Sequence, residues 1–189
     1  MKELKNIRKL LINVDMIKGF VEIGAMSDVY IKHIIPEQIR LIEEVKRDGG
    51  EIAFVKDTHK ENCEEFSKFP PHCIENTEES ELADELKPFE IDSLVYNKNS
   101  TSAMFADGFE KDICEMENLE EVIIVGCCTD ICILNLAIPL QNYFDQKDRK
   151  VKVTVPKNAV ETYNSDVHNR EEYNEIAFKL MKQAGINVK

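Results

Sequence analysis

Short apolar runs rich in β-branched residues recur along this chain, and the segments between them carry apolar positions at helical spacing. Buried strands are expected at 9–14, 51–55, 92–96, 122–125 and 150–155, with a sixth strand at 186–188 on an edge. Helices are expected at 36–49, 78–86, 107–116, 130–144 and 166–184, the last with Ile176, Leu180 and Met181 facing inward. Strands that alternate with helices predict an α/β protein in which helices cover both faces of a mostly parallel sheet.

The whole length, residues 1–189, fits one domain with a sizeable core. One segment stands apart, because residues 56–77 carry no sustained periodicity and include Pro70 and Pro71. Long structureless loops in compact domains are usually functional. This loop holds two of the four histidines in the chain, His59 and His72, so we expect it to contribute to a site.

Ionisable residues follow several of the predicted strands. Asp15 comes directly after the first strand and Asp57 after the second, while Lys98 and Cys132 follow the third and the fourth. The carboxyl ends of parallel strands meet at one edge of a sheet, where ligands bind in folds of this kind. Taken singly, Asp15 is more often a capping or turn residue, and Lys98 a solvated charge. Their joint placement predicts a catalytic site.

Cys132 falls in the first turn of the helix that follows the fourth strand, within the sequence VIIVGCCTDICI. Thr129 and Asp130, which precede it, are helix N-capping types. Unpaired backbone N–H groups and the positive end of the helix dipole favour a thiolate at such a position. The alternative is a small buried apolar residue, which is what most free cysteines are.

Asp15, Lys98 and Cys132 form a complete unit for attack on a carboxamide. Lys98 close to the thiol would favour the thiolate by Coulomb attraction. Asp15 could take the thiol proton and return it to departing ammonia. The backbone N–H groups of residues 128–132 could hold the oxyanion. These residue types therefore favour nucleophilic hydrolysis of a small amide.

The long loop carries residue types that bind divalent metals. Asp57 and His59 lie two residues apart, so in an extended chain they point to the same side and could share an ion. His72 would complete three protein ligands across the FPPH turn, and Glu64 or Glu65 could add a carboxylate. A polar loop without metal is the alternative. Such ligands suit zinc, manganese and iron alike.

Composition narrows the classes of partner. A net charge of −12 without a visible basic patch argues against nucleic acid. No apolar run approaches the roughly 20 residues of a membrane helix, so no membrane association is expected. The first residues do not read as a signal peptide, which favours a cytoplasmic protein. The six cysteines of an intracellular chain indicate free thiols rather than a disulfide framework.

Five motifs lie in an order and spacing typical of one enzyme superfamily. They are Asp15 at the strand end, DTH at 57–59, FPPHC at 69–73, NKNSTSAMF at 97–105 and GCCTDICI at 126–133. With these motifs the sequence resembles the isochorismatase-like cysteine hydrolases, and within them the nicotinamidases, also called pyrazinamidases. The resemblance covers the chain from the first strand through the fourth helix.

The resemblance implies a three-layer α/β/α sandwich with a six-stranded, mostly parallel, Rossmann-like sheet. It implies a catalytic triad of Asp15, Lys98 and Cys132. It further implies a cis peptide before Cys128, with the N–H groups of Cys128 and Cys132 as the oxyanion hole.

A divalent metal ion is also implied by the resemblance, with zinc expected first and manganese or iron as alternatives. Its ligands would be Asp57, His59 and His72, with Glu65 as a further ligand. In the family the pyridine nitrogen of nicotinamide meets this metal, which places the carboxamide over the thiol.

Some residues depart from the nicotinamidase pattern. Gly19 stands where the family often has an acid, residues 74–79 replace a GTxG sequence, and the chain has no tryptophan for a pocket wall. Phe20, Phe69 and Phe105 could supply that wall, although each is by default a core residue. The remaining histidines, His33 and His168, are expected at the surface.

The sequence therefore predicts a nicotinamidase that hydrolyses nicotinamide to nicotinate and ammonia through a cysteine thioester, as in NAD salvage. Pyrazinamide is a second expected substrate, and a homo-oligomer with the helix at 166–184 as its interface is expected from the family. One alternative is another amidohydrolase of the superfamily that acts on a different small amide. A second alternative is a non-catalytic metal-binding or thiol redox scaffold.

Overall fold

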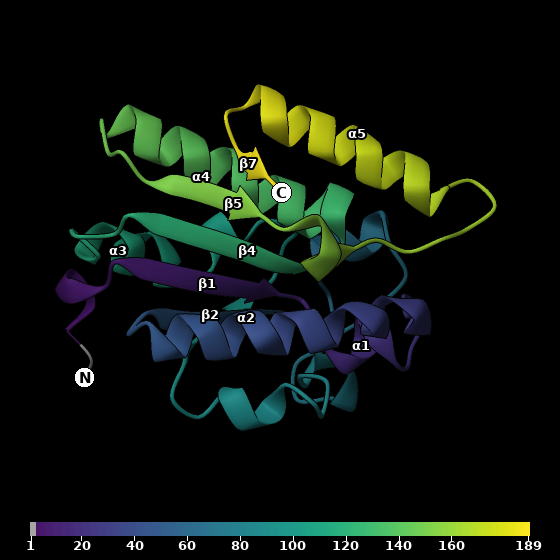
Figure 1. Ribbon diagram of the computed structural model, residues 1–189. Helices are drawn as coiled ribbons and strands as arrows, with labels where there is room; N and C mark the ends of the chain where they lie inside the picture. Colours follow the sequence, from purple (N-terminus) through teal and green to yellow (C-terminus); the bar gives the residue numbers. More distant parts are fainter. Residues whose placement is uncertain (1–2) are drawn as a thin grey trace.

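A computed structural model describes residues 3–189, and within them a seven-stranded sheet forms the middle of the molecule (Figure 1). The strands are β1 Lys9–Val14, β2 Glu51–Asp57, β3 Leu94–Lys98, β4 Glu121–Cys127, β5 Lys152–Val155, β6 Val160–Glu161 and β7 Asn187–Val188. Their order is β3-β2-β1-β4-β5-β7, with β6 paired to β4, and each of these pairings is parallel.

Helices cover both faces of the sheet (Figure 1). They are α1 Lys18–Val21, α2 Ile35–Arg47, α3 Phe109–Glu115, α4 Leu134–Gln146 and α5 Arg170–Gln183. Alternate residues of β1 enter two separate cores, because successive side chains of a strand point to opposite faces. Leu10 and Ile12 pack with α3, α4 and α5, whereas Leu11 packs with α1 and α2. The expected three-layer α/β/α fold is confirmed. The added strand, β6, has two residues and is too short to show a period in the sequence.

The helix expected at 78–86 is wrong. The structure has a 3-10 turn at Glu78–Ser80. The carboxylates of Glu78, Glu81 and Asp84 lie around the ammonium of Lys18 from α1. Lys18 Nζ lies 2.8 Å from Glu78 Oε1 and 3.5 Å from Asp84 Oδ1. The acidic residues therefore gather around one nearly buried cation instead of forming the solvated face of a helix.

The long C-terminal helix is confirmed as α5, but only part of its predicted inner face is buried. Met181 is buried, whereas Ile176 and Leu180 are 43% and 44% exposed, so their predicted burial is wrong. At 14 residues α5 is the longest helix described, and no helix in residues 3–189 has the length and apolarity to cross a membrane.

Candidate active site

The register of the sheet brings two of the predicted residues side by side. Asp57 and Lys98 are the last residues of β2 and β3, and they are partners across that pair of strands. Asp15 follows β1 directly, and its backbone turns off the strand with a positive φ of 55°, which aspartate tolerates better than most residues. The carboxylate Oδ1 of Asp15 accepts a hydrogen bond from the N–H of Asp57 at 2.9 Å. Three strand ends thus meet at one point.

Lys98 lies at the centre of this set. Its Nζ is 2.9 Å from Oδ2 of Asp15, 2.5 Å from Oδ1 of Asp57 and 3.8 Å from Sγ of Cys132. All of these side chains are buried, and Lys98 is 2% exposed. The structure therefore brings Asp15, Lys98 and Cys132 together, as the sequence predicts, and adds Asp57 as a second carboxylate on the lysine.

The second carboxylate changes the electrostatics of the thiol. Burial raises the pKa of Cys132 well above its ordinary value; Lys98 lowers it, but Asp15 and Asp57 raise it again. Because burial and the two carboxylates together outweigh the attraction of the ammonium, the raised pKa favours the neutral thiol. The expectation of a resting thiolate is wrong for this arrangement, and the thiol needs a base.

Asp15 has the properties of such a base. Burial and the nearby Asp57 raise its pKa to about 6, although Lys98 works in the opposite direction. Burial also raises the pKa of Asp57, but Lys98 and His59 outweigh it and the net pKa is lowered. Burial lowers the pKa of Lys98, and the two carboxylates overcome this and hold it above its usual value. At neutral pH the set is one ammonium with two carboxylates.

The loop that carries Cys132 is a π-helical turn, Thr129–Ile133, which is wider than the α-helical turn that the sequence suggests. At the end of β4, Gly126 has a φ of 123°, and a Cβ there would lie 2.0 Å from the carbonyl oxygen of Val14. Only glycine allows β4 to approach β1 this closely. The implied cis peptide between Cys127 and Cys128 is confirmed. All six cysteines are free in the described chain, as expected.

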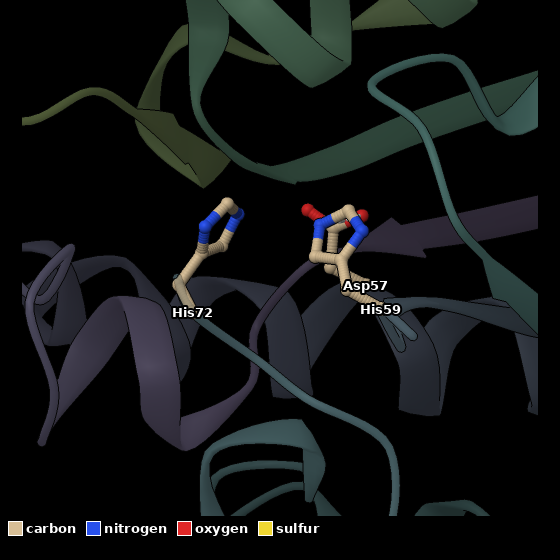
Figure 2. Close-up of side chains that lie close together, drawn as sticks. All are labelled: Asp57, His59 and His72. Atoms are coloured by element: carbon tan, nitrogen blue, oxygen red, sulfur yellow. Dashed lines mark ion pairs between the residues drawn. The ribbon is translucent and has the colours of Figure 1, made fainter. Parts of the chain in front are cut away.

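Asp57, His59 and His72 form a second group beside the thiol, and Figure 2 shows the two imidazoles on either side of a common space next to the carboxylate. One ligand atom from each residue lies within 4.8 Å of the others. The Nε2 of His59 is buried without a hydrogen bond and lies 3.4 Å from Oδ1 of Asp57. His72 donates from Nδ1 to the carbonyl of Pro70 at 2.8 Å, which leaves the lone pair on Nε2. The residues present fit a divalent cation.

Glu65 lies next to this group but not within it. Its Oε1 accepts a hydrogen bond from Thr101 Oγ1 at 2.7 Å, and its carboxylate groups with His59 and Cys63. Cys63 Sγ and Asn99 Oδ1 both lie 3.4 Å from Nδ1 of His59. Sequence reasoning missed these two neighbours of His59, because neither residue stands in a metal-binding pattern.

A narrow cavity of about 30 Å³ opens onto the thiol. It is lined by Phe20, Met26, Asp57, Glu65, Phe69, His72, Cys128, Ile131, Cys132 and Tyr163. Phe20 and Phe69 thus lie where the sequence places them, whereas Phe105 is 81% exposed and does not line the cavity. Tyr163, Met26 and Ile131 were missed. The space holds water but not a planar ring, so lining side chains must shift when a ligand enters.

A buried cysteine with a lysine and a carboxylate at the strand ends of an α/β/α fold defines a cysteine hydrolase. A family model described as the isochorismatase domain matches residues 9–188. The chain belongs to the isochorismatase family, within its nicotinamidase branch.

Relatives from three organisms support this placement. The chain is 30% identical over 173 residues to the isochorismatase family protein PncA of Bacillus subtilis, a match that covers 86% of this chain and 91% of the relative. It is 30% identical over 140 residues to nicotinamidase 1 of Arabidopsis thaliana, covering 66% of this chain and 57% of that longer relative. Among solved structures, the pyrazinamidase of Pyrococcus horikoshii in complex with zinc has a TM-score of 0.77 at 25% identity, covering 96% and 98% of the two chains.

Proposed function

We propose that this chain is a nicotinamidase, which hydrolyses the amide of nicotinamide to give nicotinate and ammonia. The observation that carries the proposal is the contact of Lys98 with both Asp15 and Cys132 in one buried site, beside the cluster of Asp57, His59 and His72. The nicotinamidase of Arabidopsis and the pyrazinamidase of Pyrococcus support an amide of an aromatic nitrogen ring as the substrate class.

Asp57, His59 and His72 are the residues that would hold a divalent ion. When bound, the ion would supply a Lewis acid that binds the pyridine nitrogen of the substrate. Zinc is our first expectation, since zinc is present in the Pyrococcus structure and suits a set of one carboxylate and two imidazoles. Glu65 is proposed to assist through His59, whose ring it approaches.

Attack begins with proton transfer from the thiol. Asp15 takes the proton of Cys132 while the sulfur forms a bond to the carboxamide carbon. Its pKa of about 6 keeps the carboxylate ionised at neutral pH and makes it a stronger base than an ordinary aspartate. Lys98 remains charged and holds Asp15 in place. The N–H groups of Cys128 and Cys132 donate to the oxyanion as it forms.

Collapse of the tetrahedral adduct breaks the carbon–nitrogen bond. Asp15 returns the proton to the leaving nitrogen, so ammonia departs and the acyl group stays on Cys132 as a thioester. A water molecule then attacks the thioester carbon and gives a proton to Asp15. As the carbon–sulfur bond breaks, Asp15 passes this proton to the sulfur, which restores the thiol and releases nicotinic acid, and the acid loses its proton to solvent to give nicotinate.

Ammonia release from nicotinamide tests the proposal. The protein is measured after loading with zinc, manganese or iron, after treatment with a chelator, and as the Cys132→Ala variant. We expect release from the metal-loaded protein, a marked loss after chelation and essentially none from the variant. Absence of release from every metal-loaded form would contradict the proposal.

A panel of small amides, including pyrazinamide, then tests the substrate. Faster turnover of nicotinamide than of the other amides supports the proposed assignment. Faster turnover of a different amide that still requires Cys132 would reassign the substrate within the same chemistry.

A further inference from the structure

His168 is buried in the fold, which contradicts the expected surface position. It is 5% exposed, and its ring lies between the rings of Tyr163 and Tyr173. The ring centroid of His168 lies 3.9 Å from that of Tyr163, with an interplanar angle of 11°. It lies 3.7 Å from that of Tyr173, with an angle of 28°. We refer to Tyr163, His168 and Tyr173 as the tyrosine–histidine stack. Tyr163 also lines the cavity that opens onto the thiol.

Both ring nitrogens of His168 contact oxygen atoms. Nδ1 lies 3.0 Å from the carbonyl oxygen of Tyr163, and Nε2 lies 2.9 Å from Oδ2 of Asp130. These two contacts and the two stacked tyrosine rings together fix the position of the imidazole.

Asp130 connects the stack to the nucleophile. It lies in the π-helical turn, two residues before Cys132, and its Oδ1 accepts a hydrogen bond from Thr162 Oγ1 at 2.5 Å. One carboxylate thus joins the turn that carries the thiol to the segment that carries Tyr163.

The same segment is anchored on its other side by Arg170. This residue donates from Nε to the carbonyl of Thr162 at 2.8 Å and pairs with Asp28 and, at 3.8 Å, with Glu161. Asp130 is the acidic group that His168 contacts directly, at 2.9 Å.

We propose that His168 is a positioning residue, which fixes the aromatic wall at Tyr163 relative to the thiol of Cys132 by bridging Tyr163 and Asp130. The proposal deepens the proposed function, since it assumes that the ring of the substrate occupies the cavity beside Tyr163. Removal of His168 would free the wall and the turn at once, so it affects both substrate binding and attack.

The first test compares His168→Asn with a matched control, His33→Asn. His33 also packs against a tyrosine, since its ring centroid lies 4.6 Å from that of Tyr30. Its Nδ1 donates a hydrogen bond to the carbonyl of Tyr30 at 2.8 Å. Unlike His168, it is exposed, and its further contact is with Glu161, at 3.7 Å, and not with the turn or Tyr163. We expect His168→Asn to lower kcat/KM for nicotinamide by about tenfold or more, with KM raised and kcat lowered, because small displacements at a reacting centre are costly. His33→Asn should change neither constant.

A second pair of variants separates the stack from the hydrogen bonds. Tyr173 backs the ring of His168 with its face, so Tyr173→Phe should keep wild-type constants. Tyr173→Ala should raise KM and affect kcat less than His168→Asn does, because the contact of His168 with Asp130 is retained. Equal values for the phenylalanine and alanine variants would argue against a role for the stack.

Two readouts do not depend on amide hydrolysis, so they separate this proposal from the proposed function. The rate at which iodoacetamide alkylates Cys132, followed by peptide mass spectrometry at a fixed alkaline pH, should change several-fold in His168→Asn and stay constant in His33→Asn. The aromatic NMR signals of Tyr163 should shift in His168→Asn and stay in place in His33→Asn.

The proposal is overturned if His168→Asn lowers the unfolding temperature but leaves KM, kcat and the alkylation rate unchanged, since His168 would then be purely structural. Unshifted signals of Tyr163 in His168→Asn would overturn the link between His168 and the aromatic wall. If the unaltered protein releases no ammonia, the proposed function fails, while alkylation and NMR still decide the role of His168.

Discussion

The two halves of the site are built in different ways. The strand-end half, formed by Asp15, Lys98 and Cys132, is held by the register of the sheet, and its ammonium is paired with carboxylates. The loop half, formed by His59 and His72, is held by packing, and the Nε2 of His59 makes no hydrogen bond and lies 3.4 Å from Oδ1 of Asp57. The first half is complete by itself, whereas the second has room for one more positive group.

Aromatic packing explains how the loop half keeps its ligand atoms open. The imidazole of His72 lies 5.5 Å from the ring of Phe20 and 5.6 Å from that of Phe66, and His59 lies 5.4 Å from Phe66, measured between centroids. Rings fix the orientation of an imidazole without using its nitrogens. A catalytic set that must hold charges therefore lies on strands, and a set that must accept an ion can lie on a packed loop.

Replacement of the nucleophile should have the largest effect. Cys132→Ala removes the only atom that can form the thioester, so we expect kcat to fall by at least about a thousandfold while the protein stays folded. Ammonia release and thermal unfolding measure the two quantities. The exposed Cys114, changed to Ala, serves as the control and should keep full activity.

Loss of the central cation should affect stability more than loss of a similar lysine elsewhere. Lys98→Met leaves Asp15 and Asp57 buried without a cation, which should lower the free energy of unfolding by about 3–5 kcal/mol. Lys18→Met is the matched control, because the acidic partners of Lys18 are largely exposed and can be solvated, so its loss should be smaller. Urea unfolding compares them, and equal losses would argue against a self-contained strand-end half.

Removal of a loop ligand should weaken metal binding and leave the apoprotein stable. His72→Asn should reduce zinc affinity by about 100-fold or more, since even supporting residues around a metal contribute 10–100-fold. Isothermal titration calorimetry measures the affinity, and urea unfolding of the metal-free protein should show little change. Unaltered zinc affinity would remove His72 from the ligand set.

The smallest effect is expected at the cavity wall. Phe20 lines the cavity and packs against His72, so Phe20→Leu should raise KM for nicotinamide a few-fold. Phe105→Leu should leave KM unchanged, because this ring is 81% exposed. Steady-state kinetics of both variants would show which phenylalanine contacts the substrate, and a larger effect at Phe105 would place it in the wall after all.

The strand-end half could be predicted from the sequence because its positions follow from a regular element. Apolar runs locate the strands, and the residues that end parallel strands meet at one edge, which is how Asp15, Lys98 and Cys132 are found. The state of the thiol could not be predicted in the same way. It depends first on the burial of the sulfur and then on the charges around it, among them Asp57, whose contact with Lys98 arises from the pairing of β2 with β3.

Contacts between segments far apart in the chain leave no periodic signal. His168 and Tyr163 follow no motif, and their burial against Tyr173 and Asp130 appears only in the folded protein. The acidic segment 78–86 has a helical composition, but it forms a 3-10 turn in which Glu78 contacts the nearly buried Lys18. In both places tertiary contacts override local preference.

The central claim, that Cys132 carries the acyl group during amide hydrolysis, is tested most directly by trapping the intermediate. Metal-loaded protein is mixed with nicotinamide and quenched in acid during turnover, and its cysteine peptides are examined by mass spectrometry. The account predicts a nicotinoyl group on Cys132 that disappears when the substrate is exhausted. A nicotinoyl group on Cys128 in place of Cys132 would contradict it, as would continued ammonia release by Cys132→Ala.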